Sequence, residues 1–446
     1  MQTALPYLVV LAIIGVVFVW PAWRSFKREE AEARAELEEA RRTGRTEPAT
    51  MLPWIDVAKC CASGLCVKAC PEGVLRVVDG RAQVTNGAAC VGHGACEAAC
   101  PTKAIELVFG SERRGVDLPR VGPDFQTNVP GVYVAGELGG MGLISNAVRQ
   151  GTQAAEAALR GVRARTHADE ATLDLVIVGA GPAGIAAALR ARQLGCSVVA
   201  CEQGEFGGAI RHYPRKKLVM SHGFTLPGGP RVEPGKMSKE ALIEVLAEAL
   251  AGSDVQVREG VRVDGVAGDR GAFTVKTSDG VVRARRVLLA AGRRGTPRRL
   301  GVPGEERDKV AYRLLEPEAC AFEAVLVVGG GDSAVEAACA LAEQEGTKVV
   351  LSYRKGTLTR PKRENQARIA ALAAAGALDL MLGSAVREIG PDRVRLHGPD
   401  GEVVLPNDRV FVFAGGILPT ALLTDAGIRL ERHFGKRVEA LEPASA

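Results

Sequence analysis

Seven of the eleven cysteines lie between residues 60 and 100, where they form two runs of the same spacing. The runs are Cys60-x5-Cys66-x3-Cys70-Pro71 and, thirty residues later, Cys90-x5-Cys96-x3-Cys100-Pro101. Thiols packed locally beside cysteine-poor regions predict metal ligation in a reducing compartment, and not a disulfide framework. Cysteines in this spacing before a proline are typical of iron–sulfur ligation.

This block, over residues 55–108, resembles a bacterial dicluster ferredoxin. In the repeated pattern C-x2-C-x2-C-x3-C-P, the fourth cysteine of each run binds the cluster of the other run. The resemblance implies two iron–sulfur clusters, 4Fe-4S or 3Fe-4S, each with three thiolates. The two expected ligand sets are Cys60 and Cys66 with Cys100, and Cys90 and Cys96 with Cys70.

The chain departs from this pattern at the second ligand position, which is Ser63 in the first run and His93 in the second. A serine oxygen or an imidazole could fill the remaining corner of each cluster, or a cluster could be a three-iron form. A hydrogen-bonding role for His93 is equally compatible with the sequence. Cys61 is a substitute ligand in the wrong register. A zinc site and a ferredoxin fold without metal are the competing hypotheses.

A glycine-rich turn follows a predicted buried strand at Leu173–Val178. The turn is Gly179-Ala180-Gly181-Pro182-Ala183-Gly184, and a helix and a second strand ending in Glu202 come after it. Glycines allow the backbone to approach a pyrophosphate that the helix N-terminus receives. An acid 23 residues after Gly179 is placed for a ribose hydroxyl. The unit predicts a site for FAD or NAD.

The same pattern recurs after the apolar strand at residues 325–328. Its turn is Gly329-Gly330-Gly331-Asp332-Ser333-Ala334. At the end of the second strand Ser352 is expected in place of the acid, and the basic residues that follow are Arg354, Lys355, Arg360, Lys362 and Arg363. A missing acid with nearby arginine accommodates a 2′-phosphate, so this site favours NADP, with NAD as the alternative.

Two such units in tandem, with Leu288–Gly292 closing the first, resemble the thioredoxin reductase-like flavoproteins over residues 113–446. The resemblance implies FAD in the first lobe, NADPH in the second, and hydride transfer between them. It also places Gly207 and Gly208 near the flavin and Gly292 at the FAD site. Hydride transfer needs no protein acid or base, so no catalytic residue is predicted.

The closing segment of that family is out of its usual place. The stretch at residues 407–419 resembles the family's returning FAD-lobe strand, but the expected "PGVYAAGD" segment and helix do not follow it. They are found earlier, as Pro130–Glu137 and a helix from Asn146 and Ala147 onward. Circular permutation is the simplest account. It makes Gly136, Glu137, Asn146 and Ala147 candidate FAD-binding residues, with Glu137 in place of the family's aspartate.

Thioredoxin reductases carry a C-x-x-C before the second glycine-rich turn, whereas this chain has Cys320 alone there. A single thiol cannot resolve a mixed disulfide. The related ferredoxin–NADP reductases also lack the dithiol. We therefore expect an oxidoreductase that passes electrons from NADPH through FAD to iron–sulfur clusters and an unknown acceptor, or in reverse. The alternatives are a reductase of small disulfides and a non-catalytic redox sensor; the glutamate synthase small subunit has a related layout.

Residues 1–23 carry no charge, and Ala4 to Trp20 is almost wholly apolar. This length is sufficient for a single-pass transmembrane helix. Arg24, Lys27 and Arg28 follow it and predict that the cofactor domains lie on the cytoplasmic side. Residues 27–43 are strong helix formers with interleaved charge and predict a solvated stalk.

The 446 residues have a net charge of only +5 and 4% aromatic residues, which argues against a nucleic-acid partner. The expected fold class is α/β, with two Rossmann-like domains, an N-terminal transmembrane helix and a small α+β ferredoxin-like domain. The oligomeric state is open, a homodimer included. The expected segments are a transmembrane helix (1–23), a charged helical stalk (24–50), a ferredoxin-like domain (51–112), the permuted closing segment (113–165), an FAD domain (170–295), an NAD(P)H domain (296–395) and an FAD-domain return segment (396–446).

Overall fold

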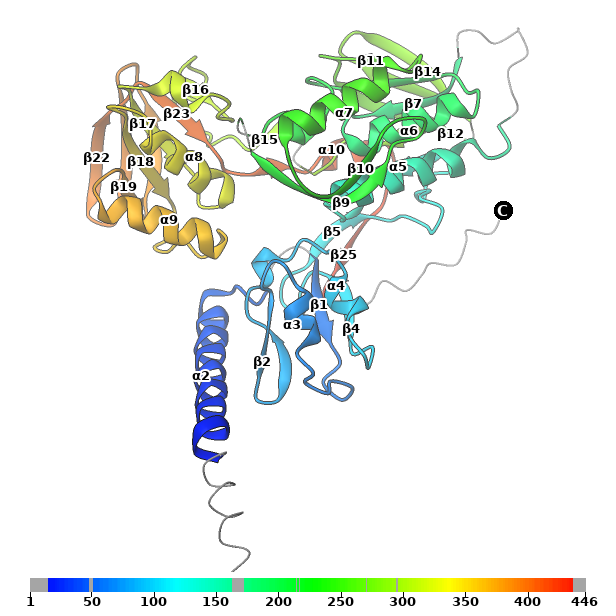
Figure 1. Cartoon of the computed structure of the whole chain (residues 1–446). Helices are drawn as coiled ribbons and strands as arrows, with labels where there is room; N and C mark the ends of the chain where they lie inside the picture. Colours follow the sequence, from blue (N-terminus) through cyan, green and yellow to red (C-terminus); the bar gives the residue numbers. More distant parts are fainter. Residues whose placement is uncertain are drawn as a thin grey trace, which may run out of the picture. The chain divides into compact units, whose positions relative to one another are not determined.

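The computed structural model describes residues 15–47, 51–162, 172–213, 215, 217–269, 271–293 and 296–435 (Figure 1). The chain divides into two compact units. The first comprises Met1–Val116 and His433–Val438, and the second comprises Asp117–Arg432 and Glu439–Ala446. The first contains the cysteine block and the second contains both glycine-rich turns.

The cysteine block folds as a small α+β domain. Strands β1 (Met51–Ile55) and β4 (Ile105–Phe109) pair antiparallel, and β2 (Leu75–Val78) and β3 (Arg81–Val84) form a hairpin. Two short helices, α3 (Leu65–Ala69) and α4 (Ala95–Ala98), each carry one cysteine of the predicted sets. Apolar residues from the strands pack around these cysteines, so the thiols belong to the core of the domain.

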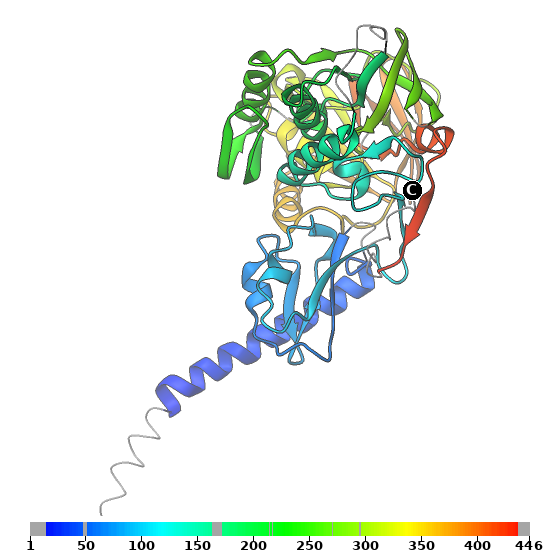
Figure 2. The same ribbon diagram turned by 90° about the vertical axis from the view of Figure 1, so that its right-hand side faces the viewer.

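Helix α2 (Trp20–Thr43) forms most of the predicted charged helical stalk, but one of its faces is not solvated. Ala33 and Leu37 are buried with Val78 of the β2–β3 hairpin. On the same side, Glu36 accepts a hydrogen bond of 2.9 Å from the Thr85 hydroxyl and pairs with Arg76. Figures 1 and 2 show α2 running beside this hairpin. The apolar contact of Ala33 and Leu37 with Val78, together with the polar contacts of Glu36, therefore docks one face of the helix onto the cysteine domain.

The predicted transmembrane helix falls mostly on residues 1–14, which lie outside the described residues. The remainder is a π-helical turn (Gly15–Val19) and the first turn of α2. Within the described part of the chain, no helix is both long and apolar enough to span a membrane.

The FAD lobe is built on a seven-stranded sheet in the second unit. Its strands, in spatial order, are β11 (Gln256–Arg258), β8 (Val198–Cys201), β7 (Thr172–Val178), β14 (Gly280–Leu289), β13 (Ala272–Thr277) and β12 (Val263–Asp269), with β6 (Val132–Val134) also paired to β14. Leu175, Val176 and Ile177 of β7 are completely buried, as expected for a central strand covered on both faces. The helices are α5 (Ile144–Leu159), α6 (Pro182–Gln193) and α7 (Lys239–Ala251), and β9 (Leu218–Thr225) and β10 (Arg231–Ser238) form a separate hairpin.

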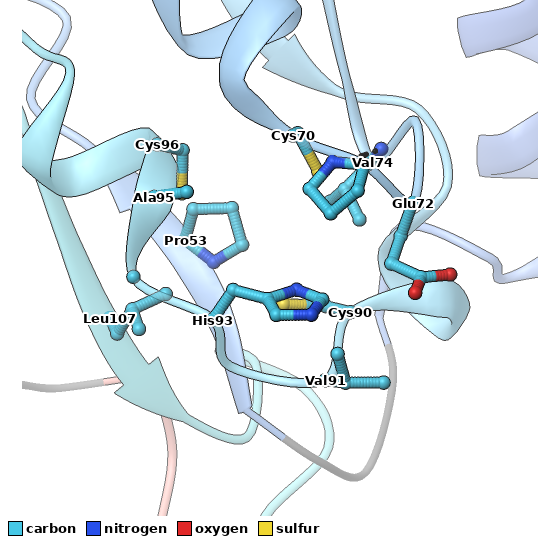
Figure 3. Close-up of a pocket in the computed structure, with 12 residues that line it drawn as sticks. Pro53, Cys70, Glu72, Val74, Cys90, Val91, His93, Ala95, Cys96 and Leu107 are labelled. Carbon is cyan, nitrogen blue, oxygen red and sulfur yellow. Dashed lines mark hydrogen bonds between the residues drawn. The ribbon is translucent and has the colours of Figure 1, made fainter. Parts of the chain in front are cut away.

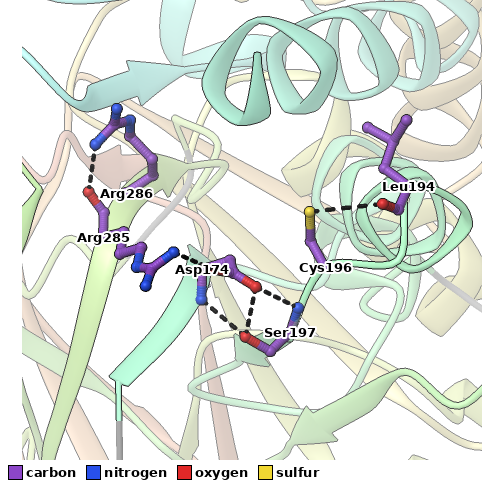
Figure 4. A network of polar contacts seen from close by, with 6 residues as sticks. All are labelled: Asp174, Leu194, Cys196, Ser197, Arg285 and Arg286. Carbon is purple, nitrogen blue, oxygen red and sulfur yellow. Dashed lines mark hydrogen bonds and ion pairs between the residues drawn. The ribbon is translucent and has the colours of Figure 1, made fainter. Parts of the chain in front are cut away.

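A buried carboxylate near the start of β7 joins this strand to β14 and to the residue that precedes β8. Asp174 accepts hydrogen bonds of 2.8 Å from both the backbone N–H and the hydroxyl of Ser197. Arg285 of β14 approaches the other Asp174 oxygen at 3.4 Å (Figure 4). The negative charge is therefore paired and hydrogen-bonded, which offsets the cost of burying it.

The NAD(P)H lobe has a five-stranded parallel sheet. Its strands, in spatial order, are β16 (Val310–Ala311), β23 (Arg409–Val412), β17 (Ala324–Val328), β18 (Lys348–Tyr353) and β19 (Asp379–Leu382). Helices α8 (Asp332–Ala342) and α9 (Arg363–Ala374) and a three-stranded sheet complete the lobe. That sheet comprises β20 (Ala385–Ile389), β21 (Arg393–Gly398) and β22 (Gly401–Pro406).

The expected start of the FAD-domain return at residue 396 is wrong. Strands β21 and β22 belong to the three-stranded sheet, and β23 pairs with the central strand β17 of the NAD(P)H lobe. The stretch that resembles a returning FAD-lobe strand is therefore an NAD(P)H-lobe strand. The return begins at β24 (Gly416–Ile417), which pairs with β15 (Thr296–Pro297). Leu423 of α10 (Thr420–Asp425) is then buried in the core of the FAD lobe.

The last described strand, β25 (Leu430–His433), forms a two-stranded sheet with β5 (Val116–Pro119). Within the second unit, Arg432 makes two hydrogen bonds of 2.8 Å to the carboxylate of Asp117. Strand β25 is thus fixed to the segment that precedes β6.

Candidate cofactor sites

The first glycine-rich turn has the geometry that close approach of a phosphate requires. Gly179 follows β7 with φ +104°, and a Cβ at this position would lie 2.6 Å from the carbonyl oxygen of Ala290. Gly181 then precedes α6 in an extended conformation, and Pro182 opens the helix. Proline suits this position because the first N–H groups of a helix have no intrahelical partner. The helix N-terminus can therefore receive an anion.

Glu202 lies beside this turn, immediately after β8. The residue is only 9% exposed. One carboxylate oxygen accepts a hydrogen bond of 2.8 Å from the N–H of Ala180, and the other accepts one of 3.1 Å from Gly204. This arrangement fixes an acceptor next to the turn, where a ribose hydroxyl of a dinucleotide is expected.

The loop after Glu202 folds back onto the same turn. The N–H of Gly207 donates to the carbonyl of Ala180 at 2.8 Å, and Gly208 lies so near Gly181 that a Cβ would be 3.0 Å from its Cα. Gly292 follows the adjacent strand β14. The predicted residues Gly207, Gly208 and Gly292 therefore come from segments next to the turn or its strand.

The early segment at residues 130–159 completes the FAD lobe. Strand β6 pairs in parallel with Val287–Leu289 of β14, and α5 packs against α6 through small residues. Gly136 follows β6, and its N–H donates to the Gln150 side chain at 2.9 Å. Asn146 and Ala147 lie in the first turn of α5. This is the placement that circular permutation of the closing segment requires.

Glu137 is set between the end of β6 and α5 in a short 3₁₀ turn (Gly136–Gly139). Arg293, which follows Gly292, is close enough to interact with it electrostatically. Burial lowers the pKa of the Arg293 guanidinium, and the carboxylates of Glu137 and Asp117 oppose that shift. The positive charge of Arg293 therefore partly balances the negative charge of Glu137 beside the FAD-lobe strands.

The second glycine-rich turn follows β17 in the same way. A Cβ on Gly329 would lie 2.7 Å from the carbonyl oxygen of Phe413, so the backbone at Phe413 passes close to this turn. Asp332, the first residue of α8, accepts hydrogen bonds from the backbone of Lys362 (2.8 Å) and the side chain of Asn365 (2.6 Å). Gly331 precedes α8, and Ser333 and Ala334 lie in its first turn.

The register of the two sheets shows that the predicted counterpart of Glu202 in the second unit is wrong. Val178 pairs with Cys201, which precedes Glu202, whereas the equivalent Val328 pairs with Ser352. The counterpart of Glu202 is therefore Tyr353, not Ser352. Ser352 is buried, with its hydroxyl 2.8 Å from that of Ser384.

Tyr353 closes over the second turn, because a Cβ on Gly330 would lie 2.3 Å from its ring. The residues after it, Arg354 and Lys355, are exposed, as is Arg360. The site thus has cationic side chains and no carboxylate at the position of Glu202, which fits a 2′-phosphate. Sequence analysis missed Tyr353 and Asn365, although aligning the two strand–turn units on Val178 and Val328 would have indicated the former.

The seven cysteines between residues 60 and 100 line two cavities of the first unit. The first is lined by Cys70, Cys90 and Cys96 together with His93 and Glu72 (Figure 3). The second is lined by Cys60, Cys66 and Cys100 together with Cys61 and Ser63. Each cavity therefore combines two thiols of one run with the last thiol of the other.

The surroundings of these thiols fit a bound cationic group. Burial, together with the charges of nearby cysteines, raises the pKa of both Cys90 and Cys96 to about 11. Thiolates in such a cavity need positive charge to balance them, which iron supplies. Among the described residues, no three His, Cys, Asp or Glu side chains are arranged to hold a single metal ion. Ligation by individual residues stays a prediction.

Comparison with known proteins agrees with this division. Residues 176–438 match the family described as pyridine nucleotide-disulphide oxidoreductase, over more than half of the chain. The chain belongs to this family. Residues 52–101 match the 4Fe-4S dicluster domain. The protein is thus an NAD(P)H-dependent flavoprotein oxidoreductase with FAD, NAD(P) and 4Fe-4S clusters as its cofactors.

Named relatives include two kinds of reductase. The chain is 31% identical to the ferredoxin–NADP reductase of Ignicoccus hospitalis over 249 residues, covering 54% of this chain and 76% of the relative. It is 26% identical to the bacilliredoxin reductase Bdr of Bacillus subtilis, covering 58% and 82%. The structure of bacillithiol disulfide reductase Bdr from Bacillus cereus aligns with a TM-score of 0.52 at 26% identity, over 58% of this chain and 82% of that one.

The four cysteines of the second unit offer no exposed dithiol. Cys320 lies at the end of a 3₁₀ turn (Pro317–Cys320) and is 1% exposed. Cys196, Cys201 and Cys339 are likewise buried. Burial raises the pKa of the Cys320 thiol, which lowers its reactivity. The thiols of the flavoprotein lobes thus pack as small apolar residues.

Proposed function

We propose that this protein takes electrons from NADPH, passes them through its FAD and iron–sulfur sites, and delivers them to an acceptor at a membrane. When bound, FAD accepts a hydride and can release electrons singly, and iron–sulfur clusters carry single electrons. The observation that carries the proposal is the presence, in one chain, of two cavities that each contain three thiols of the paired cysteine runs, and of two dinucleotide turns in a unit without an exposed dithiol.

The chain's own residues support NADP(H), in preference to NAD(H), as the pyridine nucleotide. Arg354 and Lys355 offer the charge that distinguishes a 2′-phosphate, and Tyr353 occupies the place of a ribose-binding acid. Glu202 holds the other dinucleotide turn in a form that suits FAD. The relatives named ferredoxin–NADP reductase support a one-electron iron–sulfur partner, and here such a partner is part of the same chain.

The N-terminus supports delivery at a membrane. The large apolar side chains of the first described turns are each more than half exposed, namely Val16, Val17, Phe18, Val19, Trp20, Trp23 and Phe26. They continue the uncharged segment of residues 1–14, and Arg24, Lys27 and Arg28 follow. Aromatic rings and then basic residues are typical of a membrane interface with its cytoplasmic flank. We place the cofactor domains on the cytoplasmic side of a single-pass anchor.

Anaerobic reduction of the detergent-solubilised full chain tests this function. Stoichiometric NADPH should bleach the flavin absorbance, and EPR signals of reduced iron–sulfur clusters should appear in the same sample. Flavin bleaching without any iron–sulfur signal, in protein that contains iron and sulfide, would contradict the proposal. Sedimentation with lipid vesicles, compared with a chain lacking residues 1–23, tests the anchor separately.

A second function is favoured by the similarity to Bdr, which covers 82% of that structure. The chain would then reduce a low-molecular-weight disulfide at the flavin. NADPH oxidation in the presence of bacillithiol disulfide measures this activity. Turnover that persists in Cys60→Ala and Cys90→Ala variants would replace the first function by the second, because it would not need the iron–sulfur domain.

A further inference from the structure

The two halves of the cysteine domain have the same loop conformation around the residue that replaces the second cysteine. Ser63 lies between Ala62 (φ +55°) and Gly64 (φ +70°). His93 lies between Gly92 (φ +77°) and Gly94 (φ +77°). Left-handed conformation is unusual for alanine, so the fold imposes this loop on both halves. Each central residue lines the cavity of its own half.

The two cavities differ in the side chain that the matching loops present to them. Both have three thiols in matching positions, but one has the imidazole of His93 and the other has the hydroxyl of Ser63. A neutral imidazole is a good ligand for iron. A neutral hydroxyl is a much poorer one than a thiolate. The halves are therefore equivalent in shape and unequal in their fourth donor.

Cys61 does not remove this inequality. It follows Cys60 directly and its side chain is exposed, whereas the equivalent residue of the other half is Val91. The position of Cys61 thus corresponds to a residue without a metal-binding side chain in the other half. The residue that corresponds to His93 is Ser63. The cavity of Cys60, Cys66 and Cys100 accordingly has three thiols in register and no fourth.

We propose that His93 is the fourth ligand of the cluster held by Cys70, Cys90 and Cys96, and that the cluster held by Cys60, Cys66 and Cys100 has one iron position without a protein thiolate. This inference rests on the proposed function, because both require that the cysteine domain bind iron–sulfur clusters. Replacing a thiolate by an imidazole makes a cluster less negative and raises its reduction potential, as in Rieske centres. The cluster at His93 should then have a higher reduction potential than the same cluster with a fourth thiolate.

Nitrogen coupling tests the first half of the proposal. The full chain is labelled with ¹⁵N-histidine, reduced anaerobically with dithionite and measured by pulsed EPR, with iron and sulfide determined on the same sample. We expect a histidine nitrogen coupled to one cluster, lost in His93→Cys and kept in His433→Ala. His433 is the matched control because it is the only other histidine in the first unit.

The His93→Cys variant keeps the test independent of folding, since it restores the four-cysteine pattern. We expect it to retain its iron and to show a lower reduction potential for one cluster. Iron-loaded wild type without nitrogen coupling, or coupling that persists in His93→Cys, would overturn the assignment of His93. Wild type without iron would instead overturn the proposed function together with it.

Ser63→Cys tests the second half. Mild oxidation of wild type should release one iron per chain and give a three-iron EPR signal, and Ser63→Cys should suppress both. Cys61→Ala should leave the signal unchanged. Full retention of iron in oxidised wild type, or loss of the cluster in Cys61→Ala, would show that this cluster has a fourth protein ligand.

Discussion

A Cβ on Gly151 would lie only 2.0 Å from the carbonyl oxygen of Ala183, so α5 and α6 meet backbone to backbone. Helix α5 precedes the first dinucleotide strand in sequence, whereas α6 begins at the FAD turn. Together with the pairing of β6 and β14, this contact shows that residues 130–159 are an integral part of the FAD lobe. A segment placed early in the chain therefore closes a domain that begins after it.

Gly151→Ala should separate the two helices and disturb the FAD turn. The new methyl group cannot fit without backbone movement, and such overpacking costs about 1–3 kcal/mol. We expect a lower melting temperature and a lower FAD content in the purified protein, measured from its visible absorbance. Gly265→Ala is the control, because a Cβ on this glycine of β12 would meet nothing within 4 Å. Equal FAD content in both variants would contradict the contact.

Glu202→Ala should weaken FAD binding, because it removes the acceptor beside Ala180 and Gly204. Loss of a hydrogen-bonded charged partner costs about 1.5–3 kcal/mol, which corresponds to roughly 10- to 150-fold in affinity. Titration of the apoprotein with FAD, followed by flavin fluorescence, measures the change. Glu244→Gln on the exposed side of α7 should bind FAD like wild type. An unchanged Glu202→Ala affinity would remove Glu202 from the site.

Arg354→Ala combined with Lys355→Ala should raise the KM for NADPH and leave that for NADH nearly unchanged. The two cations would contact only the 2′-phosphate that distinguishes these cofactors. We expect a rise of about tenfold, in keeping with about 1.5 kcal/mol for a hydrogen bond to a charged group. Reduction of ferricyanide reports both rates. Lys348→Ala, at the opposite end of β18, is the control. A parallel change for both cofactors would argue against the assignment to NADP.

Glu305 predicts a pH dependence of stability. Burial alone would raise the pKa of this carboxyl, but hydrogen bonds from the N–H groups of Leu300 and Gly301 and from the Tyr312 hydroxyl outweigh it, so the pKa is lowered. A depressed carboxyl pKa stabilises the fold above its unfolded value of about 4.3 and loses this contribution as the pH falls through the folded pKa.

Urea unfolding followed by circular dichroism compares wild type with Glu305→Gln. The free energy of unfolding should be lower in the variant at pH 7, and the difference should shrink below about pH 4.5. Glu306→Gln, the neighbouring substitution, provides the control. A difference that is constant with pH would mean that the charge of Glu305 has no part in stabilising this loop.

The sequence predicts most of the site because short-range patterns determine it. The turn at Gly179 and the paired cysteine runs are local, and their spacing already specifies a phosphate turn and two thiol sets. The displaced segment at Gly136 is identifiable because its residues match a family pattern wherever they stand in the chain.

The failures come from long-range packing and register. Charge periodicity predicts α2, but only its apolar contact with Val78 shows that it docks on the cysteine domain. The sequence pattern places β23 in the wrong lobe because an apolar run does not specify which strand it pairs with. The sequence pattern indicates Ser352 instead of Tyr353, because a shift of one residue along a strand reverses which side chain faces the turn.

Crossed ligation by the cysteine runs can be tested by combining substitutions. Cys70 comes from the first run but lines the cavity of Cys90 and Cys96, while Cys60 lines the other cavity. Cys70→Ala should therefore deplete the same cluster as Cys90→Ala, and the double variant should lose little more iron than either single variant. Cys60→Ala with Cys70→Ala should lose both clusters.

Iron content and the EPR spectrum of the reduced full chain distinguish these cases, with Cys61→Ala as the matched control. Ligation within each run makes the opposite prediction, because Cys60 and Cys70 would then serve one cluster. In that case their double variant would retain about as much iron as either single variant. Whether the iron losses of two single variants add in the double variant thus depends on which thiols share a cluster. The comparison holds even where the wild-type protein is not fully loaded with iron.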